Sequence, residues 1–398
     1  MNNKFISNDD VFKFHENGKI AITSQSTISN NSDLSIAYTP GVGRVSMEIY
    51  NNPNKVWDYT IRNNSVAVVS DGSAVLGLGD IGPEAAMPVM EGKALLFKQF
   101  GHIDAWPICI DTKDTEKIIE TVKLLAPTFG GINLEDISAP RCFIIEDRLR
   151  NEMDIPVFHD DQHGTAVVVL AALINACKIN NKPLNECKIV ILGAGAAGAA
   201  CAKILMESGA KQIIILDRQG IINTERNFID NPMKKWLSEN TNPLNIQGSI
   251  DQALIDADIF LGMSGPNLIT RDQILTMSAN PIVFALSNPD PEILPEEIND
   301  VVSIIATGRS DFPNQVNNAL CFPGIFRGAL DVRATTINEE MKLAAAKSIA
   351  SSISGSSLNK NCIVPNIFDS GVAESVAKAT MHAAIISGVA RVTPTSAL

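Results

Sequence analysis

The sequence predicts an α/β protein with an N-terminal α/β domain and a second, Rossmann-like domain built on a doubly wound parallel sheet. Short apolar segments alternate with helical patterns along most of the chain, which is typical of parallel sheets covered by helices. A glycine-rich turn at residues 193–198 follows one apolar segment and opens a helical one, as in dinucleotide-binding folds. The length of 398 residues suits about two or three domains.

The first part of the chain contains a polar, Asn- and Ser-rich stretch and then a series of predicted strands. The stretch covers residues 1–35, and the strands cover residues 66–69, 105–110, 131–134 and 157–158. Helical patterns lie between them at residues 83–97 and 115–125. Each strand ends in charged or small residues, and the carboxyl ends of parallel strands are where open sheets bind ligands.

The second part begins with an apolar helical pattern at residues 164–179. Predicted strands follow at residues 188–192, 212–216, 259–261, 282–286 and 303–306, with helices at 196–207 and 251–256 and a mostly helical tail at 339–391. We therefore expect a first α/β domain over residues 1–162 and a dinucleotide-binding domain over 163–340. A C-terminal helical segment, residues 341–398, is expected to pack back on the first domain.

The composition limits the classes of partner and compartment. A formal net charge of −12 and a pI near 4.9 argue against a nucleic-acid or anionic membrane surface. The seven cysteines show no Cys-x-x-Cys spacing, so buried reduced thiols are expected rather than disulfides or a zinc site. No signal-peptide pattern and no apolar run of about 18 residues is seen. We expect a soluble, cytoplasmic protein.

The glycine turn reads Gly193-Ala194-Gly195-Ala196-Ala197-Gly198. Gly193 permits the tight turn, Gly195 lets the backbone approach a pyrophosphate, and Gly198 allows close helix–strand packing. The free N–H groups at the start of the helix, at Ala196 and Ala197, would receive the phosphates.

The end of the next strand bears on which dinucleotide binds. Asp217 stands 19 residues after Gly198, where a carboxylate bonds the ribose 2′-hydroxyl of NAD. Arg218 follows it and offers a cation for the 2′-phosphate of NADP. The sequence favours NAD and leaves NADP open.

Carboxylates gather at three predicted strand ends. They are Asp71 and Asp80, Glu135 and Asp136, and Asp160 and Asp161. Neighbouring carboxylates repel one another unless a cation neutralises them, and oxygen ligands favour Mg²⁺ or Mn²⁺. The alternative is a set of solvated acids on surface loops. His159 and His163 are four residues apart, but they straddle a glycine-bearing loop without a third soft ligand, which disfavours zinc.

Other polar residues are candidates for catalysis or binding. Lys93 stands among Ala, Leu and Phe, where burial lowers the pKa of a lysine and makes it usable as a base. Tyr38 lies in a Tyr-Thr-Pro-Gly-Val turn, and its alternative role is a packed ring. Asn288 and Asn317-Asn318 follow predicted strands and can donate to a carboxylate or carboxamide, or simply cap turns.

Taken together, these segments resemble the malic enzyme family, particularly its short bacterial form. Four blocks carry the resemblance, which extends from Tyr38 to Arg391. They are DGSAVLGLGDIGP at 71–83 with EGK at 91–93, NLEDI at 133–137, FHDDQHGTA at 158–166 and GAGAAG at 193–198.

The resemblance implies oxidative decarboxylation of L-malate to pyruvate and CO₂ with reduction of NAD(P)⁺. It also implies a homodimer. By analogy, Glu135, Asp136 and Asp161 hold Mg²⁺ or Mn²⁺, Lys93 is the base with Asp160 as its charge partner, and Tyr38 is the acid. Asn288 and Asn318 resemble the family's substrate and nicotinamide contacts.

Two departures from the family pattern stand out. Ala74 follows Asp71-Gly72-Ser73 where larger relatives carry an arginine that clamps a substrate carboxylate, and residues 285–289 read Ala-Leu-Ser-Asn-Pro rather than Ala-Leu-Ala-Asn-Pro. Alternative activities on the same fold are oxaloacetate decarboxylation and conversion of malate to lactate. A more remote alternative is a dinucleotide sensor without catalysis.

Overall fold

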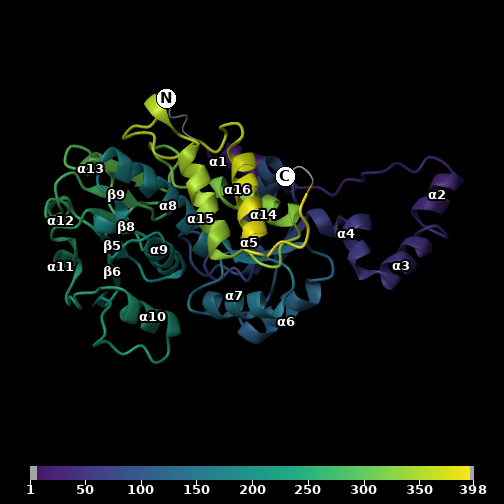
Figure 1. The fold of residues 1–398 in the computed structure, drawn as a ribbon, viewed down its shortest axis with the longest axis horizontal. Helices are drawn as coiled ribbons and strands as arrows, with labels where there is room; N and C mark the ends of the chain where they lie inside the picture. The colour runs from purple at the N-terminus through teal and green to yellow at the C-terminus, as the bar shows by residue number, and fades with distance from the viewer. Residues whose placement is uncertain (1–6, 395–398) are drawn as a thin grey trace.

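The computed structural model describes residues 7–394, which form two sheets joined by a long helix (Figure 1). The first sheet is parallel and has the strand order β2-β1-β3-β4. Its strands are β1 (Ser65–Ser70), β2 (Asp104–Cys109), β3 (Gly131–Leu134) and β4 (Val157–His159), and its helices are α5 (Pro83–Gly101), α6 (Thr115–Leu125) and α7 (Arg141–Glu152). Val69 pairs with Leu134, and Leu134 with His159. The residues that follow these three strands therefore meet at one edge.

Helix α8 (Asp160–Ile179) leads directly from β4 into the second half of the chain. It begins four residues before the predicted start at residue 164, so Asp160 and Asp161 lie in its first turn rather than in a loop. By length and composition α8 could cross a membrane, contrary to the expectation from the sequence, but 72% of its apolar window is buried inside the protein. Such burial is typical of a core helix.

The second sheet has the order β10-β9-β8-β5-β6-β7 and is parallel except for β7. Its strands are β5 (Lys188–Leu192), β6 (Gln212–Asp217), β7 (Gly220–Ile221), β8 (Ile259–Gly262), β9 (Ile282–Ala285) and β10 (Ile304–Thr307). Its helices are α9 (Ala196–Glu207), α10 (Pro232–Asn240), α11 (Ile250–Leu254), α12 (Arg271–Ile274) and α13 (Pro295–Ile298). Strands β5 and β8 are parallel neighbours, and the order in which strands are added to the sheet reverses between them. Doubly wound sheets bind ligands at such a switch point.

Three C-terminal helices connect the two halves. They are α14 (Phe322–Asp331), α15 (Glu339–Ser351) and α16 (Val372–Ile386). Helix α15 packs on α8 and α16, and α14 packs on α16 and α5. The rings of Phe322 and Phe326 in α14 lie 4.7 and 5.3 Å from that of Phe97 in α5. The domain boundaries at 162/163 and 340/341 stay a prediction.

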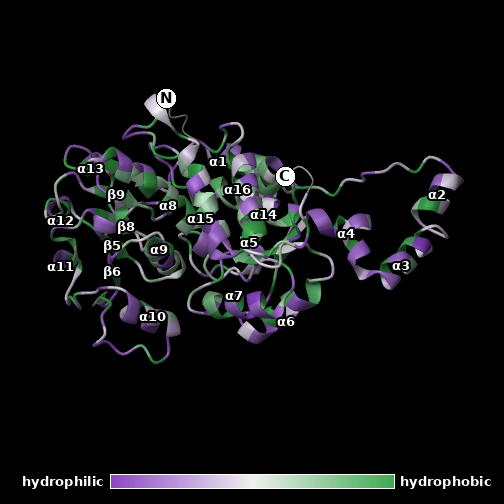
Figure 2. Cartoon of the chain, viewed as in Figure 1, coloured by the Kyte–Doolittle hydropathy of each residue, from purple (hydrophilic) through white to green (hydrophobic). Residues whose placement is uncertain are grey.

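The N-terminal arm, residues 20–51, extends away from the body of the molecule (Figure 1). Helix α1 (Asn8–His15) precedes it, α2 (Asn31–Ala37) and α3 (Val42–Asn51) lie on it, and α4 (Val56–Tyr59) follows it. None of the residues in α1, α2 or α3 is buried, although hydrophobic residues are present on both arm helices (Figure 2). Ile36 and Tyr50, for example, are 73% and 78% exposed. The arm thus leaves large apolar side chains exposed.

Most predicted elements are confirmed, with ends displaced by a few residues. The helix expected at 83–97 continues to Gly101, and the one expected at 251–256 is the shorter α11. The prediction missed the short strand β7 and helices α3, α4, α7, α10, α12, α13 and α14. It also missed the 3₁₀ turns, which are η1 (Pro53–Lys55), η2 (Ile61–Asn64), η3 (Leu184–Glu186), η4 (Asn318–Leu320) and η5 (Gly355–Ser357). All seven cysteines lie within the described residues, none forms a disulfide, and five are buried.

Candidate active site

Three carboxylates gather at the carboxyl edge of the first sheet. Glu135 and Asp136 directly follow β3, and Asp161 lies in the first turn of α8. One oxygen of each lies within 4.8 Å of the others. The backbone N–H of Asp136 donates to Oδ2 of Asp161 over 2.7 Å. The two loops are thus held together, and the carboxylates face one point.

The electrostatics of this acidic group fit a divalent cation. Burial, together with repulsion from Asp161, raises the pKa of Asp136 to about 7. Burial and the neighbouring carboxylates also raise the pKa of Glu135 well above its ordinary value, although Lys93 opposes this shift. Oδ2 of Asp136 is buried without a hydrogen-bond partner among residues 7–394. Three oxygen donors with an unsatisfied buried atom suit Mg²⁺ or Mn²⁺.

Lys93 reaches this edge from α5. Its Nζ lies 2.6 Å from Oδ2 of Asp160 and 2.9 Å from Oε1 of Glu135, with 11% of the side chain exposed. Burial alone would lower the pKa of Lys93, but these two carboxylates outweigh burial and raise the pKa. The expectation of a lowered pKa is therefore wrong for the arrangement seen here, because the local sequence does not reveal the two carboxylates.

Asn318 also lies at the site. Its Nδ2 donates to Oδ2 of Asp160 over 3.0 Å, and its Oδ1 accepts from the hydroxyl of Thr165 over 3.1 Å. The neighbouring Asn317 caps η4 instead, since its side chain accepts from the N–H of Ala319. The structure thus separates the two alternatives for this pair: Asn317 is the cap, and Asn318 contacts the site.

Asn288 lies where the two halves of the chain touch. A Cβ placed on Gly77 would come within 1.9 Å of the carbonyl oxygen of Asn288, and one on Gly308 within 2.5 Å of its Nδ2. Gly77 therefore permits the loop after β1 to approach the loop after β9. Among the described residues, no hydrogen bond joins Asn288 to the acidic group.

The other predicted residues add no carboxylate to the acidic group, although Nε2 of His159 lies 3.0 Å from Oδ2 of Asp161. Asp71 pairs with Arg141 over 2.8 Å, and Asp80 pairs with Lys113, so neither adds a ligand to the group. His159 and His163 flank a helical turn rather than a loop. Tyr38 is 67% exposed on the arm, and α2, which it follows, stands apart from α5 (Figure 1).

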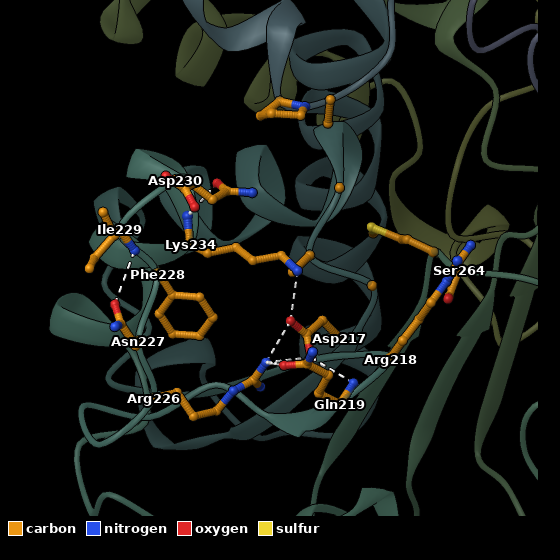
Figure 3. Close-up of a pocket in the computed structure, with 17 residues that line it drawn as sticks. Asp217, Arg218, Gln219, Arg226, Asn227, Phe228, Ile229, Asp230, Lys234 and Ser264 are labelled. Carbon is orange, nitrogen blue, oxygen red and sulfur yellow. Dashed lines mark hydrogen bonds and ion pairs between the residues drawn. The ribbon is translucent and has the colours of Figure 1, made fainter.

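The glycine turn borders a cavity of about 980 Å³ (Figure 3). Gly193 has φ of 124°, and a Cβ on Gly198 would lie 1.8 Å from the carbonyl oxygen of Gly193. Gly195, in contrast, faces open space, and half-buried Ala196 and Ala197 begin α9 behind it. Loop residues Ala139 and Pro140, which follow the acidic group by three residues, line the same cavity. The cavity thus extends from the glycine turn towards the first sheet.

Asp217 lines this cavity and pairs with two cationic side chains that the sequence did not indicate. Both its oxygens accept from Nη2 of Arg226, over 2.9 and 2.8 Å, and Oδ2 also accepts from Nζ of Lys234 over 2.7 Å. Figure 3 shows both cations pointing at Asp217. Burial would raise the pKa of Asp217, but Lys234 and Arg226 hold it below its ordinary value. Arg226 and Lys234 come from a loop and from α10, so no spacing rule identifies them.

We predict that Asp136→Asn weakens Mn²⁺ binding by more than about tenfold, because it removes one anionic oxygen donor. The same change should raise the thermal midpoint of the metal-free protein, because it relieves repulsion between buried carboxylates. Calorimetric titration with Mn²⁺ and thermal denaturation measure the two effects. Asp80→Asn, which alters a carboxylate outside the group, is the control. Equal Mn²⁺ affinity in the two variants would contradict the assignment of Asp136.

Comparisons with known proteins agree with this geometry. Residues 17–150 match the family model "Malic enzyme, N-terminal domain", and residues 162–385 match "Malic enzyme, NAD binding domain". The chain is 57% identical to the NAD-dependent malic enzyme of Geobacillus stearothermophilus over 96% of this chain and 80% of that protein. It is 53% identical to the bifunctional malic/malolactic enzyme of Bacillus subtilis over 94% and 92% of the respective chains.

A solved structure shows the same fold. The crystal structure of the malic enzyme from Pyrococcus horikoshii superposes with a TM-score of 0.93 at 48% identity, over 97% of this chain and 92% of that one. With both of its domains matched, this chain belongs to the malic enzyme family.

Proposed function

We propose that this protein catalyses the oxidative decarboxylation of L-malate to pyruvate and CO₂, with reduction of NAD(P)⁺ and with Mg²⁺ or Mn²⁺ as cofactor. The observation that carries the proposal is the position of Lys93. Its ammonium lies within 2.9 Å of Glu135 and within 2.6 Å of Asp160, beside three carboxylates suited to a cation. The cavity beside the glycine turn is also lined by Ala139, which follows Asp136 by three residues in the chain.

In this proposal Glu135, Asp136 and Asp161 hold the cation. When bound, a divalent ion would neutralise these carboxylates, lower the pKa of the substrate's C2 hydroxyl and favour negative charge on that oxygen. Asp160 and Asn318 orient Lys93: Asp160 pairs with its Nζ, and Asn318 donates to the same carboxylate oxygen. Phe322, whose ring centroid lies 4.3 Å from Nζ, covers the amine from the other side.

Lys93 and Tyr38 carry out the two proton transfers of the proposed reaction. Lys93 takes the proton of the C2 hydroxyl while a hydride passes from C2 to the nicotinamide, which gives oxaloacetate. Cleavage of the C3–C4 bond then releases CO₂ and leaves the enolate of pyruvate. Tyr38 protonates C3, and Lys93 returns its proton to Tyr38. Asp160 and Glu135 raise the pKa of Lys93, and a cation beside Glu135 would offset part of that shift.

The first test is reduction of the nucleotide by malate. Wild-type protein with L-malate and Mn²⁺ should form about one reduced nicotinamide per CO₂, because hydride transfer precedes decarboxylation. Lys93→Ala should reduce turnover by at least about 10²-fold while NADH still binds, since it removes a general base. Lys98→Ala, in the same helix but on the surface beside Asp104, should keep wild-type turnover. Absence of nucleotide reduction in the wild type would refute the proposed reaction.

A second candidate is conversion of malate to lactate with the nucleotide retained. The similarity to a bifunctional malic/malolactic enzyme is the observation that favours it. The two reactions use the same cation site and differ in the fate of the hydride. The ratio of reduced nucleotide to CO₂ separates them, because malolactic conversion leaves no net reduced nucleotide.

We further propose that the nucleotide site accepts both NAD and NADP. Arg226 and Lys234 already compensate Asp217, so that carboxylate repels a 2′-phosphate less than an isolated one would. Arg218 is exposed, lines the cavity and forms no ion pair with the described part of the chain. These contacts weaken the preference for NAD that Asp217 alone suggests.

Lys234→Gln tests the nucleotide proposal. The change should lower kcat/KM for NADP by about tenfold, since it removes a charge-assisted contact to a phosphate. The value for NAD should change much less. Lys235→Gln, one residue along and paired only loosely with Glu239, is the control. Equal losses with both nucleotides would contradict a role of Lys234 at the 2′ position.

We also propose a homodimer in which the arm of one copy completes the site of the other. The sequence has three tyrosines, and all of them are exposed: Tyr38 by 67%, Tyr50 by 78% and Tyr59 by 54%. None of the three tyrosines is therefore buried beside Lys93 in its own chain. The exposed apolar residues of the arm need a covering surface, and a second copy supplies one with two-fold symmetry.

Mixed dimers test this arrangement. Tyr38→Phe and Lys93→Ala should each be nearly inactive alone. In a hybrid, the intact Tyr38 of one subunit would serve the intact Lys93 of the other, so coexpression should restore about one quarter of wild-type activity for random pairing in a two-fold dimer. If Tyr38 serves its own chain, both sites of the hybrid stay defective, and no activity should return.

A further inference from the structure

We propose that Glu292 is a positioning residue that holds the two loops facing the nicotinamide half of the bound nucleotide. The inference rests on the proposed function and concerns a side chain that neither the motifs nor the reaction identified. Glu292 follows the end of β9 by seven residues and is 0% exposed. Within residues 7–394 it forms hydrogen bonds but no ion pair. A carboxylate buried without a cation is retained only where donors surround it.

The carboxylate of Glu292 joins the loops that follow β8 and β9. The backbone N–H of Ser264, two residues after β8, donates to Oε1 over 2.9 Å. The backbone N–H of Ser287, two residues after β9, donates to Oε2 over 3.1 Å. Burial raises the pKa of Glu292, and these N–H groups oppose that shift. Each carboxylate oxygen thus holds one loop, and both loops depend on the same side chain.

Gly262, the last residue of β8, makes room for this side chain. A Cβ at Gly262 would lie 2.4 Å from Cδ of Glu292 and 2.6 Å from its Oε2. The backbone of Glu292 is fixed as well, because its carbonyl oxygen accepts from the N–H of Ile269 over 3.2 Å. The carboxylate therefore occupies one place between the two loops.

These loops lie on one side of the switch point between β5 and β8. Doubly wound sheets bind one mononucleotide half on each side of such a point. Asp217 ends β6 and would take the adenosine ribose, so the nicotinamide half would lie over β8 and β9. Ser264 lines the cavity beside the glycine turn, and Asn288, the residue expected to contact the nicotinamide, directly follows Ser287. Glu292 thus fixes the backbone around the reacting end of the nucleotide.

Glu292→Gln is the informative change because it keeps the shape of the side chain and alters only its donors and acceptors. The amide has one oxygen, so its NH₂ group must face the N–H of either Ser264 or Ser287. Two donors then oppose each other in a buried place, and one loop loses its acceptor. Asp217 and the glycine turn keep all their contacts.

Binding of NADH and of ADP-ribose, measured by calorimetric titration, separates a positioning role from a structural one. ADP-ribose carries the adenosine and both phosphates of NADH but lacks the nicotinamide ring. Glu292→Gln should weaken NADH binding by about tenfold, since a buried hydrogen bond is lost, and should leave ADP-ribose binding at the wild-type value. With L-malate and Mn²⁺, kcat should fall by about 10²-fold, because a small displacement of reacting groups is enough for such a loss.

Glu297→Gln is the matched control, since Glu297 is exposed on α13, five residues further along the chain. It should keep the wild-type values of both affinities and of kcat. A second variant, Gly262→Ala, displaces the carboxylate of Glu292 by a single methyl group. It should produce the same selective loss of NADH binding, and it replaces Glu292→Gln if that variant is unstable.

Equal NADH affinity in Glu292→Gln and Glu297→Gln would overturn the inference. Equal losses of NADH and ADP-ribose binding would also overturn it, because they indicate damage to the whole nucleotide site. Failure of both Glu292→Gln and Gly262→Ala to fold would make Glu292 a structural residue and so contradict the positioning role. Wild-type protein that binds neither NADH nor ADP-ribose, or that reduces no nucleotide with malate, would instead refute the proposed function.

Discussion

The surplus of negative charge buried at the carboxyl edge of the first sheet is the constraint on which the site depends. One ammonium, that of Lys93, faces Asp160 and Glu135, with Asp136 and Asp161 beside them. Buried charges are costly unless they are paired, and a single lysine cannot balance four carboxylates. Burial and repulsion from Asp161 accordingly raise the pKa of Asp136. A divalent cation, as the proposed function requires, would remove this imbalance.

The fold brings these groups together from separate elements. Lys93 comes from α5, Glu135 from the end of β3 and Asp160 from the start of α8. Aromatic packing between Phe97 in α5 and Phe322 in α14 joins the lysine-bearing helix to the second half of the chain. The close approach of Gly77 to Asn288 adds a second connection. These two contacts hold the half of the chain that carries the acidic group against the half that carries the glycine turn.

Much of this architecture was predictable from local patterns. The glycine turn and the strands around it were identified because a strand, a tight turn and a helix follow one another within a few residues. Glu135, Asp136 and Asp161 were identified because carboxylates at the ends of parallel strands meet at one edge. Glu292 escaped notice, because a single Glu in a proline-rich loop looks like a solvated surface charge until its burial is known. Arg226 and Lys234 escaped notice for a similar reason.

The sequence by itself determined the class of fold, the order of its elements and the residue types available for catalysis, since these depend on periodicity and on neighbours along the chain. Only the tertiary structure decided how those residues behave. It showed that Lys93 has a raised rather than a lowered pKa, that Asp217 is compensated by two cations and that Tyr38 is exposed on the N-terminal arm. Each of these properties depends on charge and burial contributed by residues distant in the chain. A local sequence pattern does not reveal which distant residues supply this charge and burial.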